Sequence, residues 1–424
     1  MGRETSTARP RVVILGGGFA GIGAAQKLKK ADAEVVLFDH HDYHTFQPLL
    51  YQLATGLLET TGVGHSLRDL VHGHDNTTVH KTAVTAVDLE AKSVQLEEMA
   101  PLSYDYLVLA LGAQVNFFGT DGASEHAFPM YTLPDALRLK EHVLDRWEAA
   151  DKDPTLIDDG ALNVVVVGGG PTGVETAGAM AELYRGEFTR DYPNVAQESA
   201  HIVLVEAGPE VFAMFEPDIR EYTVKALAKR TVEVKTGEIV SAVRPTRVTL
   251  KSGDELKAHT LVWGAGLQGN RLVDSLGLKL ERGNRIGVGP ELTVTGYPEL
   301  YAVGDIAAIT DAKTEQVLPQ LGSVALQSGE HAGETIARRI AGKDVKPFKY
   351  KDKGTMATIG RGAAVVQMLG GRTMKGKAAQ AAWGTVHLAL LPTNEDRAKA
   401  IVNWAGAGLT HQRAGRITVS ADRD

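Results

Sequence analysis

Short apolar runs rich in β-branched residues alternate with amphipathic stretches along this chain of 424 residues. Arg11–Leu15 predicts a buried strand, a helical pattern continues through Lys30, and Glu34–Phe38 predicts a second strand. This order of elements is typical of a βαβ unit with parallel strands. Asp42–Gly64 shows no clear period, so we expect it to be rich in loops around the apolar segment QPLLYQL.

The opening pattern is repeated in the middle of the chain. Asn163–Val167 and His201–Val205 predict strands on either side of a helix at Val174–Arg185. An amphipathic helix at Thr132–Ala150 and a polar linker at Asp151–Gly160 precede this second unit. Further strands are expected at Tyr106–Leu111, Thr260–Trp263 and Tyr301–Val303, and a further helix at Val324–Ile340.

The duplication predicts an α/β fold with two Rossmann-like domains and a C-terminal α+β or helical region. From Lys346 the pattern changes to short strands and basic loops, followed by helical stretches around Ala378–Leu391 and Glu395–Leu409. Because no apolar run reaches about 18 residues, we expect no transmembrane helix. Met1–Pro10 is polar, and we expect no signal peptide there.

Charge is distributed unevenly along the chain, whose formal net charge is −7. Residues 346–424 contain 13 Lys and Arg against 5 Asp and Glu, a balance of +8, so the preceding residues have a balance of −15. The acidic whole argues against a nucleic-acid partner. The basic end predicts a surface that meets an anionic partner, with a solvated lysine-rich face as the alternative.

The chain contains no cysteine. Disulfides, Cys-ligated zinc, iron–sulfur clusters and thiol nucleophiles are therefore excluded, and the composition fits a cytoplasmic location. Five histidines, at positions 40, 41, 44, 72 and 74, show no regular ligand spacing. We interpret them as residues of surface loops and expect no metal site.

The first strand is followed by a glycine loop, Gly16-Gly17-Gly18-Phe19-Ala20-Gly21, which fits the G-x-G-x-x-G pattern. Gly16 would make the tight turn, Gly18 would let the backbone approach a pyrophosphate, and Gly21 would let the helix close on the strand. The helix N-terminus favours phosphate, and Asp39 ends the second strand, where a carboxylate accepts ribose hydroxyls. The sequence therefore predicts dinucleotide binding, with a packing turn as the alternative.

The second unit contains the same loop, Gly168-Gly169-Gly170-Pro171-Thr172-Gly173, and its acid is Glu206. The acid is further from the loop than expected, and we interpret the polar segment between Gly186 and Ser199 as an insertion. A carboxylate here favours NADH over NADPH because it repels a 2′-phosphate. Two dinucleotides in one chain indicate one flavin and one nicotinamide, although glycine spacing does not decide which site holds which.

Seven segments together resemble one family, the type II NADH:quinone dehydrogenases, in order from Arg11 to about Arg416. They are VVILGGGFAGIGAA, FDHHDYHTFQPLLYQLATG, VVVGGGPTGVETAG, VLVEAG, LVWGAG, YAVGDIA and YKDKGTMATIGRGAAV. HDYHTFQPLLYQLATG and DKGTMATIGR are the most specific of these, whereas YAVGDIA and the second glycine loop occur across the wider superfamily of two-domain flavoprotein reductases.

The resemblance implies an FAD-binding domain at residues 1–120 and 290–345, a connecting helix and linker at 121–160, an NAD-binding domain at 161–289 and a C-terminal domain at 346–424. The residues expected at FAD are Gly16, Gly18, Phe19, Ala20, Gly21, Asp39, Gln47, Val84, Ala110, Gly112, Asp305 and Val324. Those expected at NADH are Gly168, Gly170, Pro171, Thr172, Gly173, Glu206 and Gly266.

The resemblance also implies two catalytic residues, Glu175 near the flavin and nicotinamide and Lys353 near the flavin and a quinone. The alternative for Glu175 is a simple partner of the helix dipole in the first turn, and the alternative for Asp305 is a helix N-cap. A helix that begins near Gly322 would direct its positive end at the flavin.

The implied activity is hydride transfer from NADH to FAD and then two electrons to a quinone, without proton pumping. Relatives whose chemistry needs cysteines are excluded. A reductase of a ferredoxin-like protein and a redox-sensing NADH- and FAD-binding protein remain as alternatives.

Two departures from the family pattern concern the electron acceptor. Where the family has A-Q-x-A-x-Q, this chain retains Gln327 but has Ser323 in place of the first glutamine; both are candidate quinone ligands. The C-terminal apolar stripe is narrow and alanine-rich. We expect peripheral attachment to an anionic membrane surface, on the inner face of the cell membrane, with a core-packing or dimer-forming helix as the alternative. A homodimer is common in the family and is expected here.

Overall fold

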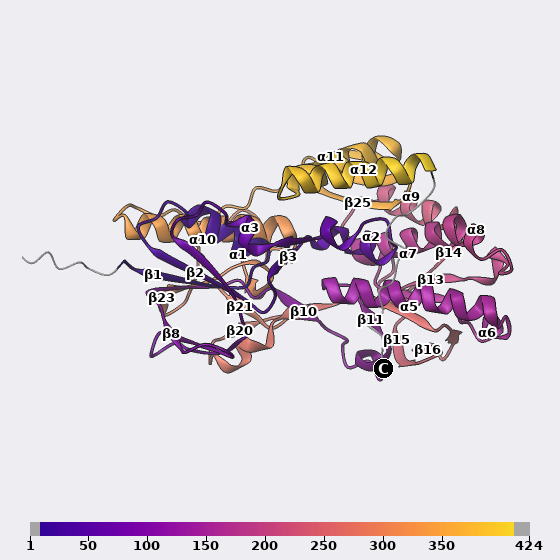
Figure 1. The fold of residues 1–424 in the computed structure, drawn as a ribbon, viewed down its shortest axis with the longest axis horizontal. Helices are drawn as coiled ribbons and strands as arrows, with labels where there is room; N and C mark the ends of the chain where they lie inside the picture. Colours follow the sequence, from indigo (N-terminus) through magenta and orange to yellow (C-terminus); the bar gives the residue numbers. More distant parts are fainter. Residues whose placement is uncertain (1–8, 411–424) are drawn as a thin grey trace, which may run out of the picture. The chain divides into compact units, whose positions relative to one another are not determined.

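The computed structural model describes residues 9–410, which contacts divide into two compact units. The first unit comprises residues up to 45, 65–114 and 267–351, and the second comprises 46–64, 115–266 and 352 onwards. Most of the polar N-terminal segment Met1–Pro10 and the last residues of the predicted C-terminal domain lie outside the described residues. Figure 1 labels the elements of both units.

The first unit is built on a six-stranded sheet. Its strand order is β22 (Thr293–Val294), β23 (Tyr297–Ala302), β9 (Tyr106–Leu109), β1 (Arg11–Leu15), β2 (Glu34–Asp39) and β5 (Thr77–Lys81). All neighbouring pairs are parallel except β22 with β23. The central strand β1 has four consecutive fully buried residues, because a parallel strand covered on both faces must be apolar throughout.

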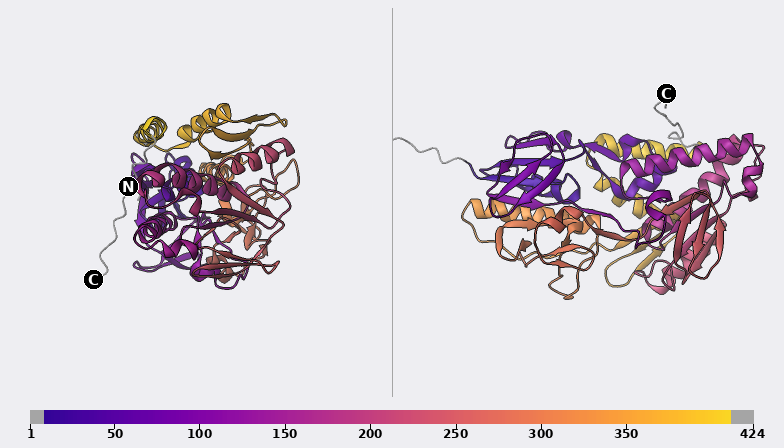
Figure 2. Two further views of the ribbon diagram at one scale, coloured as in Figure 1. Left: turned by 90° about the vertical axis from the view of Figure 1, so that its right-hand side faces the viewer. Right: turned by 90° about the horizontal axis from the view of Figure 1, so that it is seen from below.

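Two helices of this unit, α1 (Phe19–Leu28) and α10 (Gly322–Ile340), cross in close backbone contact. A Cβ atom added at Gly329 would lie 1.9 Å from the carbonyl oxygen of Ala20, and one at Gly333 would lie 2.4 Å from that of Ala24. Only glycine therefore fits on this face of α10. Figure 2 shows the indigo start of the chain and the orange stretch beyond residue 267 side by side in this unit.

Two small antiparallel layers complete the first unit. One contains β6 (Val84–Asp88), β7 (Ser93–Leu96) and β8 (Leu102–Ser103). The other contains β20 (Leu280–Glu281) and β21 (Arg285–Gly287), which is joined in parallel by β24 (Ala307–Ala308).

The second unit repeats the architecture with a five-stranded parallel sheet. The order is β11 (Phe128–Pro129), β18 (Thr260–Trp263), β12 (Val164–Val167), β13 (Ile202–Glu206) and β14 (Val232–Thr236). Its helices include α5 (Leu133–Lys152), α7 (Pro171–Leu183) and α9 (Pro217–Ala228). The predicted duplication is confirmed, since β1 and β12 occupy corresponding places in two parallel sheets.

Residues of the C-terminal third also belong to the second unit. A three-stranded sheet, β25 (Thr355–Gly360), β26 (Ala363–Gln367) and β27 (Thr373–Lys375), is followed by α11 (Lys377–Leu390) and α12 (Asn394–Thr410). Strand β25 packs on α7, where a Cβ atom at Gly178 would lie 2.2 Å from the carbonyl oxygen of Ile359. No helix within residues 9–410 is both long and apolar enough to cross a membrane.

The structure corrects the interpretation of Asp42–Gly64 as mainly loop. Leu50–Ala54 forms a helix, α2, in which every residue is buried. A helix of five residues is too short to show a helical period in the sequence, so the apolar residues of this segment did not identify it as helical.

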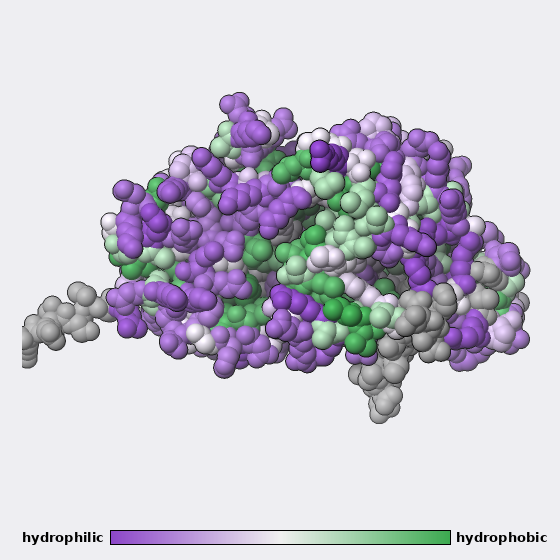
Figure 3. Space-filling view, turned by 90° about the horizontal axis from the view of Figure 1, so that it is seen from above, coloured by the Kyte–Doolittle hydropathy of each residue, from purple (hydrophilic) through white to green (hydrophobic). Residues whose placement is uncertain are grey.

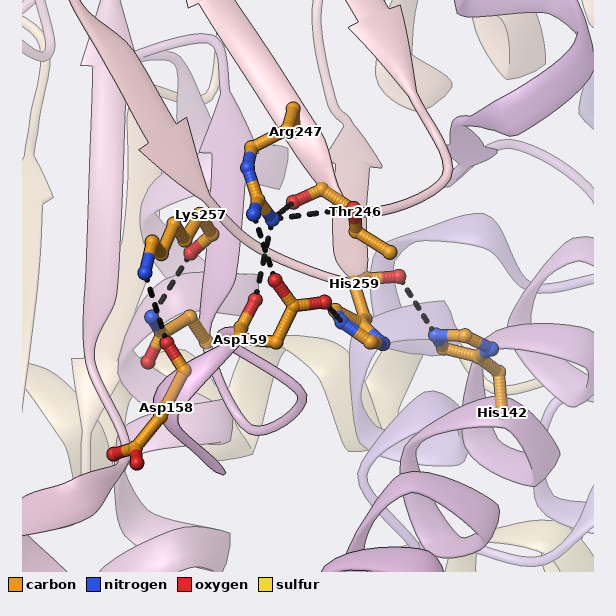
Figure 4. A network of polar contacts seen from close by, with 8 residues as sticks. His142, Asp158, Asp159, Thr246, Arg247, Lys257 and His259 are labelled. Atoms are coloured by element: carbon orange, nitrogen blue, oxygen red, sulfur yellow. Dashed lines mark hydrogen bonds and ion pairs between the residues drawn. The ribbon is translucent and has the colours of Figure 1, made fainter. Parts of the chain in front are cut away.

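The linker Asp151–Gly160 is also more ordered than expected, since Thr155–Asp158 forms helix α6. Figure 4 shows how its end is tied to the three-stranded sheet of β15 (Val240–Arg244), β16 (Arg247–Leu250) and β17 (Glu255–Lys257). The carboxylate of Asp159 accepts from Arg247 Nη2 at 2.7 Å and lies 3.2 Å from His259 Nε2. The carbonyl oxygen of His259 in turn lies 3.0 Å from His142 Nε2 on α5.

The polar segment between Gly186 and Ser199, which we interpret as an insertion, also contributes aromatic side chains that pack on α5. A π-helical turn at Tyr184–Phe188 and helix α8 (Thr189–Asp191) place an aromatic cluster on α5. Trp147 of α5 contacts the rings of Tyr184, Phe188 and Tyr192 at centroid distances of 4.9, 4.8 and 5.6 Å. Tyr184, Phe188 and Tyr192 are spaced four residues apart, but the polar residues between them made this helical period hard to recognise in the sequence.

Candidate functional site

The first glycine loop joins β1 to α1 and has the geometry of a pyrophosphate cradle. Gly16 has φ +105°, and a Cβ atom there would lie 2.3 Å from the carbonyl oxygen of Ala110. A Cβ atom at Gly21 would lie 1.8 Å from the carbonyl oxygen of Gly16, so this glycine permits close packing of α1 on β1. Nothing lies within 4 Å of the position of a Cβ atom at Gly18, which leaves open space where a phosphate would approach the backbone.

Asp39 at the end of β2 holds the middle of this loop. Its Oδ2 accepts from Gly17 N at 2.6 Å, and its Oδ1 accepts from His41 N at 2.8 Å. An ionised carboxylate has about four lone-pair sites, so it can still accept ribose hydroxyls. Asp39, His40 and His41 also bring three potential metal-ligand atoms within 4.8 Å, but the carboxylate already accepts two backbone N–H groups.

His44 is a second support of the first loop, and it was wrongly interpreted as a surface residue. Its ring is buried, and Nδ1 lies 3.0 Å from the carbonyl oxygen of Gly17. Burial lowers the pKa of His44 to about 4. The ring is therefore neutral at pH 7, with its proton on Nδ1 because a carbonyl oxygen can only accept.

The turn that contains Asp305 lies against the same loop. A Cβ atom at Gly304 would contact Ala20 Cβ at 3.0 Å and Ala325 Cβ at 3.4 Å. Ser328 of α10 accepts from Gly304 N at 3.0 Å. Asp305 is in a short 3-10 turn, Gly304–Ile306, that has no side-chain cap, so the N-cap alternative is wrong.

Helix α10 begins beside Phe19, since a Cβ atom at Gly322 would lie 3.5 Å from the phenyl ring. Its N-terminus has no side-chain cap and no acidic residue in the first turn. Val324 in that turn is buried. The turn of Asp305 and the start of α10 thus lie near the first loop, which Asp39 also contacts; that these residues bind FAD remains a prediction.

Three other predicted FAD residues are Gly112 and Val84 in the first unit and Gln47 in the second. Gly112 has φ +65° just after β9, and Val84 begins β6. Gln47 belongs to the second unit, where its Nε2 donates to the carbonyl oxygen of Tyr131 at 3.4 Å. Contacts with FAD remain predictions for all three.

The second cradle, between β12 and α7, reproduces the first almost atom for atom. Gly168 has φ +109°, and a Cβ atom at Gly173 would lie 1.8 Å from the carbonyl oxygen of Gly168. Gly170 again has nothing within 4 Å of its Cβ position. Glu206 Oε2 accepts from Gly169 N at 2.5 Å, and its Oε1 accepts from Gly208 N at 2.6 Å.

Pro171 and Thr172 start α7, so the helix begins three residues earlier than predicted. Proline suits this place because a first-turn N–H would have no helical partner. Beyond β18, Gly266 has φ +70°, and its Cβ position is blocked by the ring of Phe118 at 2.5 Å. Asn116, which the sequence did not single out, donates from its N to the carbonyl oxygen of Gly266 at 3.0 Å.

Glu175 lies in the second turn of α7, where the dipole of the helix N-terminus acts only weakly. The dipole alternative is therefore disfavoured. The carboxyl group is buried and accepts from Thr358 N at 3.1 Å. Burial raises the pKa of Glu175 to about 8, which marks it as a candidate for proton transfer. Lys353, the other predicted catalytic residue, is exposed just before β25.

The two candidate quinone ligands bind a neighbouring segment within the first unit. Ser323 Oγ lies 2.9 Å from the hydroxyl of Tyr350. Gln327 Nε2 donates to the carbonyl oxygen of Lys351 at 3.1 Å, and its Oε1 accepts from Lys351 N at 3.0 Å. A quinone would therefore compete with, or add to, these hydrogen bonds.

The sequence is also similar to that of known proteins. Residues 10–329 match the pyridine nucleotide-disulphide oxidoreductase family. The chain is 33% identical over 99% of its length to the type II NADH:quinone oxidoreductase Ndh of Mycobacterium tuberculosis, of which 93% is covered. It is 31% identical over 88% of its length to the type II NADH:quinone oxidoreductase of Staphylococcus saprophyticus, of which 92% is covered.

Solved structures support the fold. The chain matches NDH2 of Plasmodium falciparum in complex with NADH with a TM-score of 0.88, at 21% identity, over 97% of this chain and all of that one. The sulfide:quinone oxidoreductase of Aquifex aeolicus matches with a TM-score of 0.72, at 20% identity, over 95% of this chain and 96% of that one.

Proposed function

Because the chain belongs to the type II NADH:quinone oxidoreductase family, we propose that it oxidises NADH through bound FAD and passes two electrons to a quinone. The observation that carries this proposal is the pair of glycine cradles. In each cradle, a Cβ atom at the first or third glycine of the G-x-G-x-x-G pattern would collide with backbone, whereas the second glycine of the pattern, Gly18 or Gly170, has open space beside it. An acid at the end of the following strand accepts a hydrogen bond from the loop. Open space at Gly18 and Gly170 fits two pyrophosphates.

The first cradle would hold the pyrophosphate and ribose of FAD. Loop N–H groups and the start of α1 would bind phosphate oxygens, and Asp39 would accept ribose hydroxyls. Asp305 would accept from the ribityl chain, and the uncapped start of α10 would stabilise negative charge on the flavin ring. When bound, FAD accepts the hydride of NADH and releases its electrons to the acceptor.

The second cradle would hold NADH. Glu206 would accept the 2′-hydroxyl of the adenosine ribose, and Ala207 and Gly208 offer no cation to a 2′-phosphate. Glu175, with its pKa near 8, would hold or release a proton near neutral pH. We assign Lys353 to the flavin and quinone, and Ser323 and Gln327 to the quinone.

We also propose that the enzyme attaches peripherally to the anionic inner face of the cell membrane, and that it forms a homodimer. Helices α11 and α12 expose Val386, Leu390, Ile401 and Val402 at 39, 42, 50 and 68%. Figure 3 looks onto the side that bears these helices, where apolar surface gathers between polar areas. The balance of +8 in residues 346–424 supports attraction to anionic lipid. Sedimentation with phosphatidylglycerol vesicles at low and high salt tests the attachment.

Stopped-flow spectroscopy tests the reaction. FAD-loaded protein is reduced with NADH and then mixed with a menaquinone or ubiquinone analogue, with oxygen, or with a ferredoxin. We expect rapid reoxidation by the quinone and slow reoxidation by the other two. Reoxidation only by the ferredoxin, or slow turnover with every acceptor, would contradict a quinone reductase.

A further inference from the structure

A chain of buried hydrogen bonds connects Glu175 on α7 with the C-terminal helix α12, all within the second unit. Thr358 of β25 donates from its N to Glu175 Oε1 at 3.1 Å, and its hydroxyl lies 2.8 Å from the hydroxyl of Tyr51 on α2. Gln52 Nε2 donates to the Tyr51 hydroxyl at 2.9 Å. Trp404 Nε1 of α12 donates to Gln52 Oε1 at 2.8 Å.

Every inner member of this chain is buried. Tyr51, Gln52, Thr358 and Glu175 are each at most 9% exposed. Buried polar groups of this kind are strongly position-dependent, because removal of one partner leaves another without a hydrogen bond. The chain therefore fixes the places of its members relative to one another.

The charged and titratable side chains near this network are few. Glu175 and Glu182 both lie on α7, and α2 contributes Tyr51. Strand β25 contributes no charged side chain, since its sequence is TMATIG. Burial and the negative charge of Glu175 both raise the pKa of Tyr51, so the phenol remains protonated.

Helix α12 is held in place by aromatic contacts beside this chain. The ring of Trp404 lies 5.5 Å from that of Trp383 on α11, which stacks on His387 at 4.1 Å. His387 also contacts Phe46, at 6.4 Å. On another face α12 exposes Ile401 and Val402. One helix thus presents an apolar outer surface and an inward hydrogen-bond donor.

We propose that Trp404, Gln52 and Tyr51 are positioning residues for Glu175, so that the seating of α12 controls how well this carboxyl group is shielded from water. The effect on catalysis rests on the proposed function. The connection between α12 and Glu175 rests only on contacts within this protein. Loss of the Trp404 donor would free Gln52, loosen Tyr51 and Thr358, and admit water to Glu175. A better-hydrated carboxyl group ionises at lower pH.

Two tryptophans provide a matched pair for the test. Trp404→Phe removes an N–H that donates to Gln52, whereas Trp383→Phe removes an N–H that has no hydrogen-bond partner within residues 9–410. Both substitutions leave a phenyl ring in the same aromatic cluster. Tyr51→Phe interrupts the series of hydrogen bonds closer to Glu175, and Glu175→Gln removes the titrating group.

The first measurement is the pH dependence of kcat for NADH and a quinone, from pH 5 to 9, with FAD-loaded protein. We expect Trp404→Phe and Tyr51→Phe to lower the midpoint of the profile by about one pH unit, and Trp383→Phe to leave it unchanged. Identical profiles for the two tryptophan variants would overturn the inference.

The second measurement needs no turnover. The pKa of Glu175 is raised from 4.5 to about 8, so between these values the folded protein retains a proton that the unfolded chain releases. The contribution of Glu175 to stability should therefore fall as pH rises across this range. We expect Glu175→Gln to remove part of that fall in melting temperature, and Trp404→Phe to confine it to lower pH. An inactive wild type would refute the proposed function, whereas unchanged melting profiles would refute the linkage.

Discussion

The two glycine cradles reach the same backbone geometry with different supports. In both, the acid accepts from the N–H of the second residue of the loop, at 2.6 Å from Asp39 and 2.5 Å from Glu206. In both, the carbonyl oxygen of that residue is also bound. His44 Nδ1 binds Gly17 in the first cradle, whereas Phe212 N donates to Gly169 at 2.8 Å in the second.

This difference separates what nucleotide binding requires from what folding supplies. The turn, the open glycine and the acid occur twice, so we attribute them to the proposed binding of pyrophosphate and ribose. The support of the carbonyl oxygen is met once by a titratable side chain and once by backbone. In the first cradle a titratable side chain binds this carbonyl oxygen and in the second a backbone N–H does, so substitutions should affect the two cradles unequally.

The largest effect is expected where a side chain meets backbone. Gly21→Ala would place its Cβ atom 1.8 Å from a carbonyl oxygen and should destabilise the protein by about 3 kcal/mol or more, because α1 must move off β1. Gly18→Ala meets no atom within 4 Å, so the apoprotein should melt near the wild-type temperature but retain little FAD.

Gly173→Ala and Gly170→Ala form the equivalent pair in the second cradle. Gly170→Ala should keep its FAD and show a raised KM for NADH. Calorimetry and flavin content after gel filtration measure these effects. Equal melting temperatures for Gly21→Ala and Gly18→Ala would show that the loop tolerates a side chain at both places.

An intermediate effect is expected from the acid of the second cradle. Glu206→Gln keeps an oxygen to accept from a backbone N–H but removes the charge that repels a 2′-phosphate. The ratio of kcat/KM for NADH to that for NADPH should fall about tenfold, which corresponds to roughly 1.4 kcal/mol. Asp39→Asn in the first cradle is the matched control, and a fall in the same ratio there would contradict the assignment of the two sites.

The smallest effect is expected from His44. Its folded pKa of about 4 lies below the ordinary 6.5, so between these values the unfolded chain binds a proton that the folded protein does not. The contribution of His44 to stability should decrease as pH falls from 6.5 to 4. His44→Gln keeps a donor for Gly17 without titrating, and its melting temperature should fall less steeply over this range. Because His142 and His387 also have a pKa near 4, the slope should be reduced but not abolished.

The parts that the sequence predicted well depend on local pattern. Residues such as Val12–Leu15 of β1 are buried on both faces of the sheet, so each of the four has the same environment. The glycine loops were also predictable, because the G-x-G-x-x-G spacing is itself a local pattern. A Cβ atom at Gly21 would collide with the carbonyl oxygen of Gly16, and one at Gly16 with that of Ala110.

The parts that the sequence did not predict depend on contacts between distant segments. His44 is distinguished from the exposed His40 only by the carbonyl oxygen 27 residues away that it binds. Likewise, Tyr51 pairs with Thr358 across 307 residues, so no local period announces their contact. The aromatic residues at 184, 188 and 192 did leave a period of four, but too few residues share it to outweigh the polar ones around them.

The glycine at position 178 limits how this protein can be shortened or recombined. Its missing side chain lets β25 lie directly on α7, the helix that follows the second glycine loop. A protein truncated after α10 would lack β25 and would leave an uncovered apolar surface on α7. It would be expected to aggregate or be degraded. Exchange of the residues after α10 between relatives should succeed only when the segment that carries Gly178 is exchanged with them.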